Sequence, residues 1–247
     1  MTKKIIFVFA VFLASCTSNK ALKHPLDKSK SKTVVLENGL KVYLLSDPSF
    51  NVSAASVSVE VGSLDNPDDR QGLAHFLEHM LFLGTEKYPD VDEYSSYLKT
   101  YGGYSNAYTA SDHTNYQFQV LPDGFEGALD RFSQFFISPL FTEEYTAREV
   151  NAVNSEHQKN KLNDNWRQFR VSSLFAKEGH PERKFGTGNL ETLGDITREE
   201  LIRFYKQHYS ANRMGVALLS THTLEEMESW CRQYFSSMPR TASSTAA

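Results

Sequence analysis

The stretch GLAHFLEHMLFLGTEKYP, residues 72–89, combines a hydrophobic helical pattern with three side chains suited to metal chemistry. Its apolar residues keep helical spacing up to Gly84, which predicts a helix with one face in the core. His75 and His79 are four positions apart, so a helix brings both imidazoles within reach of one ion. Glu78 points to a neighbouring part of that face. The segment therefore predicts a core helix that also contributes a metal site.

Two imidazoles with a nearby carboxylate suit zinc. A catalytic zinc ion with three protein ligands keeps a fourth position for water and lowers the pKa of that water to about 7. Glu78 could then accept a proton from the water and pass it to a leaving amine. The spacing H-x-x-E-H is also a protease motif. The alternative is a core helix with incidental histidines that have polar partners, and we favour the catalytic metal site.

A third ligand has to come from elsewhere in the chain. The pattern predicts a second helix from Thr142 to about Phe169, with Thr142 as N-cap and acidic residues in the first turn. Glu149 and Glu156 are two turns apart on it and share a face. Spacing alone equally fits a solvated acidic stripe. His157 is a rival ligand, although it points about 100° away from Glu156.

The rest of the chain predicts an α+β fold in which a largely antiparallel, mixed sheet is covered by helices. Two strands are expected around Asn38-Gly39, a dipeptide that favours a type I′ turn. Period-two alternation predicts further strands over 51–63 and on both sides of a turn near Ser111-Asp112. Apolar periodicity predicts helices over 123–141, 197–210 and 223–238, with a strand over 213–220.

Length and composition fit a soluble globular domain. The chain has 247 residues, 40% of them hydrophobic, which is enough to bury a substantial core. A formal net charge of −4 gives no reason to expect a nucleic-acid partner. The segment FGTGN lacks the full spacing of a phosphate-binding loop, so Gly186 and Gly188 are treated as ordinary loop residues.

The N-terminus predicts export and a lipid anchor. Residues 1–15 have a basic start and an apolar stretch too short to span a bilayer, as in a signal peptide. LASC, residues 13–16, resembles the lipobox of bacterial lipoproteins, which makes Cys16 a lipidation site; the alternative is a plain signal peptide with an accidental cysteine. Residues 16–32 form a flexible polar tether. We expect attachment to the bacterial cell envelope on the periplasmic side, with a weak preference for the outer membrane.

The metal helix and REVNAVNSEHQKN, residues 148–160, together resemble the inverted-motif zinc peptidases of the pitrilysin and insulin-degrading enzyme family, peptidase family M16. Similar segments follow in the same order, among them YGGYSNAYTASDHTNYQFQV, KFGTGN and LIRFYKQHYSANRMGVALLS. The resemblance implies that residues 33–239 form the N-terminal catalytic domain of that family, with the same α+β fold, and that residues 240–247 are a disordered tail.

The resemblance also implies roles for individual residues. Its metal ligands, for one Zn2+ per chain, would be His75, His79 and Glu156. Glu78 would be the general base, and Glu149 would orient an imidazole. Peptide substrate would add as an extra strand to an edge strand that contains Asn106 and Ala107.

Full-length members of the family have four related domains in two halves, and this sequence covers the first. Two functions are therefore expected. The first is a zinc metalloendopeptidase that cleaves peptides alone, by self-association or with a second chain that supplies the missing half. The second is a zinc- and peptide-binding domain with little or no turnover unless such a partner is present, because substrate is not held in a reactive geometry.

Overall fold

The computed structural model describes residues 23–24 and 26–241. The predicted signal peptide, Cys16 and the end of the predicted tail lie outside the described residues, so these features stay predictions. Within the described part of the chain, every helix is too short or too polar to cross a membrane.

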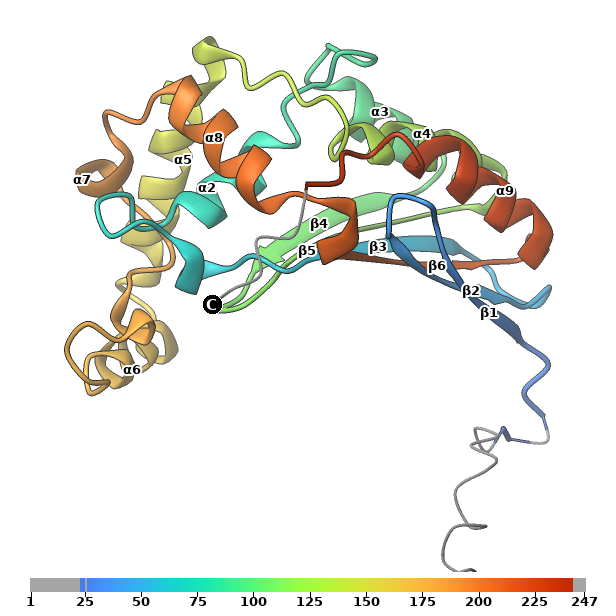
Figure 1. Cartoon of the computed structure of the whole chain (residues 1–247), viewed down its shortest axis with the longest axis horizontal. Helices are drawn as coiled ribbons and strands as arrows, with labels where there is room; N and C mark the ends of the chain where they lie inside the picture. The colour runs from blue at the N-terminus through green and yellow to red at the C-terminus, as the bar shows by residue number, and fades with distance from the viewer. Residues whose placement is uncertain (1–22, 25, 242–247) are drawn as a thin grey trace, which may run out of the picture.

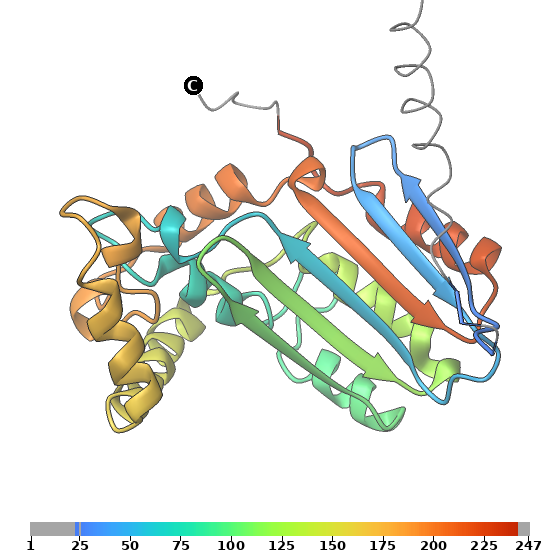
Figure 2. The ribbon, with the colours of Figure 1, turned by 90° about the horizontal axis from the view of Figure 1, so that it is seen from below.

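The described residues form one six-stranded sheet with the order β1-β2-β6-β3-β5-β4. Strands β2 and β6 pair in parallel and the other neighbours are antiparallel, so the sheet is mixed and largely antiparallel. Its strands are β1 Lys30–Val35, β2 Lys41–Ser46, β3 Ser53–Val59, β4 Tyr104–Thr109, β5 Thr114–Val120 and β6 Met214–Ser220. Figure 2 shows the sheet from the face that the helices leave open. The predicted α+β fold is confirmed.

The helices cover one side of this sheet or lie beyond its end (Figure 1). Over the strands lie α3 Glu93–Thr100, α4 Phe125–Gln134 and α9 Leu224–Phe235, and beyond the end of the sheet lie α2 Leu73–Met80, α5 Glu143–Asn160, α6 Asp164–Ser173, α7 Leu190–Leu193 and α8 Arg198–His208. Short 3-10 turns span Ser63–Asp65, Pro122–Gly124, Pro181–Arg183 and Ala211–Arg213. The α2 helix packs against both α5 and β4, so it joins the sheet to the second helix of interest.

The core lies between the sheet and the helices. Alternate residues of β3 and β5 are buried, as the period-two pattern requires. Tyr116 of β5 and Phe136 are fully buried with ring centroids 5.4 Å apart, and Phe76 of α2 is buried in the same cluster. The metal helix is therefore fixed by burial of its apolar face.

The first hairpin forms, but its turn is not type I′. Only Gly39 has a positive φ, of +87°, and the amide of Gly39 donates to the carbonyl of Leu36. The loop is thus a turn followed by one left-handed glycine, an arrangement that three-residue hairpin loops favour. Strand β1 begins at Lys30, inside the predicted tether, because Lys30 pairs with Ser46 and Lys32 forms an ion pair with Glu228.

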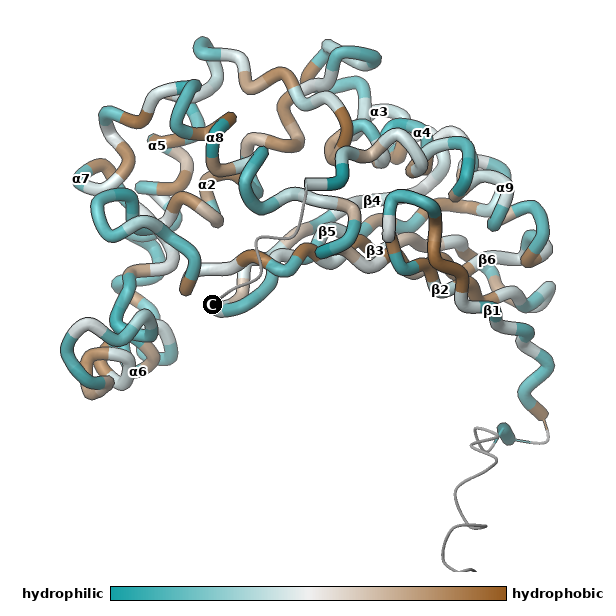
Figure 3. Tube along the Cα trace, in the orientation of Figure 1, coloured by the Kyte–Doolittle hydropathy of each residue, from teal (hydrophilic) through white to brown (hydrophobic). Residues whose placement is uncertain are grey.

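The single helix expected from Thr142 to Phe169 is wrong. The chain forms α5 and α6 instead, and the side chain of Asn163 accepts hydrogen bonds from the amides of Asn165 and Trp166. This N-cap starts a new helix, which helical periodicity alone does not reveal. Figure 3 shows hydrophobic residues on α6 although that helix stands apart from the sheet. Trp166 and Phe169 are 46% and 57% exposed, so α6 contributes surface and little core.

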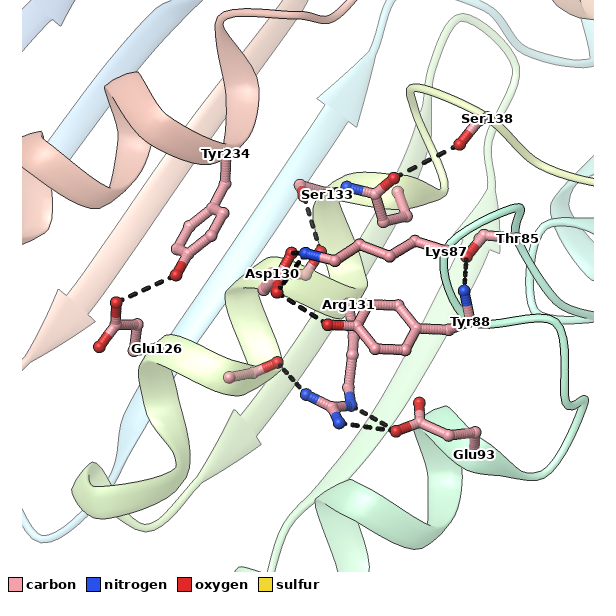
Figure 4. Close-up of polar contacts among 12 residues, drawn as sticks. Thr85, Lys87, Tyr88, Glu93, Glu126, Asp130, Arg131, Ser133, Ser138 and Tyr234 are labelled. Atoms are coloured by element: carbon pink, nitrogen blue, oxygen red, sulfur yellow. Dashed lines mark hydrogen bonds and ion pairs between the residues drawn. The ribbon is translucent and has the colours of Figure 1, made fainter.

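A polar network joins α3 and α4 (Figure 4). The Arg131 guanidinium donates to Glu93 through Nε and lies over the Tyr97 ring, 3.8 Å from its centroid. It also lies 4.6 Å from the Tyr88 centroid, and the Tyr88 hydroxyl donates to Asp130. One planar cation therefore connects three segments of the helical layer.

Arg131→Lys should lower the free energy of unfolding by about 1–2 kcal/mol, because an ammonium cannot reproduce both the forked hydrogen bonds and the ring stacking. Denaturant unfolding measures this loss. The control is Arg232→Lys, at a half-exposed ion pair with Glu228, which should change stability by less than about 0.5 kcal/mol. Equal losses in the two variants would contradict a special role for Arg131.

Candidate metal centre

His75 and His79 project from α2 toward α5. Their ring centroids are 4.8 Å apart, and the rings are nearly perpendicular. Asn66, fully buried, accepts a hydrogen bond from the backbone amide of Ala74 and so fixes the first turn of the helix. The first turn is therefore held by a buried side chain, and the two imidazoles keep a defined position.

Glu156 of α5 completes a triangle with the imidazoles. Its Oε2 lies 3.5 Å from His75 Nε2 and 3.7 Å from His79 Nε2. Ligands held about 2.0–2.1 Å from a tetrahedral zinc ion are roughly 3.3 Å apart, so both separations fit zinc. Among the described residues, these three form the group whose ligand atoms all lie within 4.8 Å of one another. Two imidazoles and one carboxylate are also the donors of a catalytic zinc site with an open position.

The outer nitrogen of each imidazole has its own partner. His79 Nδ1 lies 3.3 Å from Glu149 Oε2, and His75 Nδ1 lies 2.8 Å from the backbone carbonyl of Thr187. Because carbonyl and carboxylate oxygens only accept, these contacts place a proton on Nδ1 of each ring and turn its Nε2 toward Glu156. Both rings therefore present Nε2 to the same point.

Helix α5 places Glu149 and Glu156 on the side that faces α2. Val153, halfway between them, is fully buried. The Glu149 side chain is 14% exposed and that of Glu156 is 38% exposed, and both contact His79, so they are not a solvated stripe. His157 packs against Phe185, with ring centroids 4.8 Å apart, and is not one of the three clustered groups.

Glu78 is nearly buried beside the triangle, with 7% of its surface exposed. One of its oxygens, Oε2, accepts a hydrogen bond of 2.5 Å from the hydroxyl of Thr109, the last residue of β4. Burial raises the pKa of Glu78, against the opposing effects of His75 and of that hydrogen bond. A carboxylate with a raised pKa and one oxygen left outside this bond is suited to accepting a proton.

The charges of the site favour a cation. Burial lowers the pKa of His79, but its hydrogen bond with Glu149 and its ion-pair contact with Glu156 outweigh burial and raise that pKa to about 9. The contact with His79 lowers the pKa of both Glu149 and Glu156. Three carboxylates around two imidazoles thus attract positive charge, and the donor set fits zinc.

The predicted substrate residues lie on an edge strand. Strand β4 is the last in the sheet order and pairs on one side with β5, where Asn106 faces Gln117 and Ala107 faces Tyr116. Asn106 is exposed and Ala107 partly buried. Among the described residues the outer edge of β4 is unpaired, and because β4 also packs against α2, this edge lies close to the metal triangle.

Two contacts of the site were not predicted. The hydroxyl of Thr109 and the backbone carbonyl of Thr187 have no distinctive sequence pattern, although Thr187 lies in the segment FGTGN, which the sequence alone assigns to an ordinary loop. Gly186 and Gly188 on either side of Thr187 are the sequence feature that could have indicated this contact, since glycines often occur where two backbones approach closely.

Comparison with known proteins places this site in a family. Residues 41–178 match the family model described as insulinase (peptidase family M16), and residues 195–246 match the one described as the peptidase M16 inactive domain. The chain is 50% identical to the insulin-degrading enzyme of Drosophila melanogaster and 47% identical to that of Homo sapiens, in each case over 88% of this chain. The crystal structure of pitrilysin superimposes with a TM-score of 0.87 over 91% of this chain, at 37% identity.

These matches cover only part of each relative. The chain spans 23% of the Drosophila protein, 22% of the human protein and 24% of the pitrilysin chain. The matched region contains α2, α5 and the whole His-His-Glu triangle. The chain therefore belongs to the insulinase family, peptidase family M16.

Proposed function

We propose that this chain is a zinc-dependent metalloendopeptidase domain that hydrolyses peptide bonds. The observation that supports this function best is the triangle of His75, His79 and Glu156, with the buried carboxylate of Glu78 beside it. Three ligands leave one position for water, and a base next to that position is what amide hydrolysis requires.

Metal binding, proton transfer and orientation of the base fall to different residues. His75, His79 and Glu156 would hold the ion, which when bound supplies an acidified water and polarises a carbonyl. Glu78 accepts the proton of that water and returns it to the departing amine nitrogen, so the peptide bond breaks without net proton uptake. The hydroxyl of Thr109 holds one oxygen of Glu78 and thereby orients the other.

The edge strand β4 would bind the substrate backbone. A peptide that pairs with its free edge gains main-chain hydrogen bonds that do not depend on side-chain identity. Asn106 and Ala107 lie on this strand, three and two residues before Thr109, the partner of Glu78. Binding at this edge would therefore bring a backbone carbonyl toward the base and the metal.

A second function is binding of zinc and peptide with little turnover unless a second chain or a second copy completes the site. The observation in its favour is that Glu156 is 38% exposed and that the described residues leave the outer edge of β4 unpaired. A peptide held on one side only spends less time in a reactive geometry.

Glu78→Gln should leave zinc content at one ion per chain and reduce peptide cleavage by about 100-fold to 10,000-fold, because the ligands remain and the base is lost. A quenched fluorescent peptide and metal analysis on the same sample measure both. Glu144→Gln, at an exposed site on α5, is the control and should cleave normally. Undiminished cleavage by Glu78→Gln would contradict the assignment, and zinc without cleavage in the wild type would favour the second function.

Glu156→Gln should weaken zinc binding at least about 100-fold, since loss of an inner ligand should exceed the loss of an outer partner. His157→Gln is the matched control and should retain wild-type affinity. Competition with a chromogenic chelator measures both dissociation constants. Wild-type affinity in Glu156→Gln together with weakened zinc binding in His157→Gln would show that His157 is the third ligand.

We also propose that Cys16 carries a lipid that attaches the chain to a bacterial envelope membrane, on the evidence of the sequence LASC at residues 13–16. Cys16→Ser should move the protein from the membrane fraction to the soluble fraction, because the acylated sulfur is removed. Fractionation with immunoblotting tests this. Membrane association that persists in Cys16→Ser, without lipid in the mass spectrum, would show that another anchor is present.

A further inference from the structure

The segment Lys184–Gly188 reaches across to the start of the metal helix. Its most direct contact is the hydrogen bond from His75 Nδ1 to the carbonyl of Thr187, at 2.8 Å. The acceptor is a backbone atom, so its position depends on the path of the loop and not on a side-chain rotamer.

Two glycines allow this path. A β-carbon added at Gly72, which has φ of +93°, would lie 2.3 Å from the Cα of Gly188, closer than two carbon atoms can approach without a bond. A β-carbon added at Gly188, with φ of +84°, would lie 2.5 Å from Leu193 Cδ1 and 3.3 Å from the Cα of Gly72. Backbone therefore packs on backbone at the residue that precedes α2, and both positions require glycine.

The other end of the segment is tied to the chain that leads into α2. Lys184 Nζ donates to the carbonyls of Leu64 and Asn66, at 3.1 and 2.6 Å. The amide of Phe185 donates to the side chain of Gln71, at 2.6 Å. The segment is thus attached to residues 64–72 on both sides of Thr187. It therefore keeps a fixed position relative to α2, whose His75 it contacts.

From these contacts we infer that Lys184–Gly188 is a positioning element of the metal site, with Gly188 as its critical residue. It holds the proton of His75 on Nδ1 and aims Nε2 at Glu156, as Glu149 does for His79. The inference rests on the proposed zinc site and assigns to FGTGN a role in metal retention. Outer partners of this kind change metal affinity because they fix ring orientation and ligand basicity.

Gly188→Ala tests the inference through zinc affinity, measured by chelator competition. We expect about a 10-fold to 100-fold loss, because a displaced loop moves the Thr187 carbonyl away from His75. Gly179→Ala is the matched control: Gly179 also has a positive φ, of +76°, but a β-carbon there meets nothing within 4 Å. It imposes similar backbone strain away from the site and should bind zinc like the wild type.

Wild-type affinity in Gly188→Ala, or an equal loss in both variants, would overturn the inference. A wild type that binds no zinc would instead overturn the proposed function, so the two failures are distinguishable. If Gly188→Ala does not fold, nitrogen-15 NMR of the histidine rings in the zinc-loaded wild type decides. The expected signature for His75 is zinc on Nε2 and a slowly exchanging proton on Nδ1; zinc on Nδ1 would overturn the inference.

Discussion

The packing of α5 against α2 is the constraint on which the site depends. Val153 of α5 is fully buried, and it lies between the two glutamates that meet the imidazoles. The metal triangle therefore takes its geometry from the packing of two rigid helices, with one ligand on α5 and two on α2. Sites built on helices hold their ligands more reproducibly than sites built on loops.

The same helix serves the core and the chemistry. Apolar side chains of α2 such as Phe76 and Met80 are fully buried, while His75, Glu78 and His79 line the metal site. Burial of a carboxylate is costly unless it is hydrogen-bonded, and the Thr109 hydroxyl provides such a bond. Thr109, at the end of the edge strand β4, thus stabilises Glu78, which would act on a peptide bound along that strand.

The sequence predicted the parts of the site that local periodicity controls. Spacing predicted that His75 and His79 lie together and that Glu149 and Glu156 share one face of a helix. It could not predict which element that face packs against, because this depends on tertiary structure. The carbonyl that holds His75 belongs to a residue 112 positions away, and a backbone acceptor has no residue type to recognise. The helix break was missed because an N-cap at Asn163 competes with an uninterrupted helical pattern.

The most direct test of the account is X-ray absorption at the zinc edge on the protein loaded with one zinc ion per chain. The account predicts two imidazole nitrogens and two to three oxygens at about 2.0–2.1 Å, from His75, His79, Glu156 and water. A sulfur scatterer at about 2.3 Å, or a shell with fewer than two imidazoles, would contradict the site proposed for this chain.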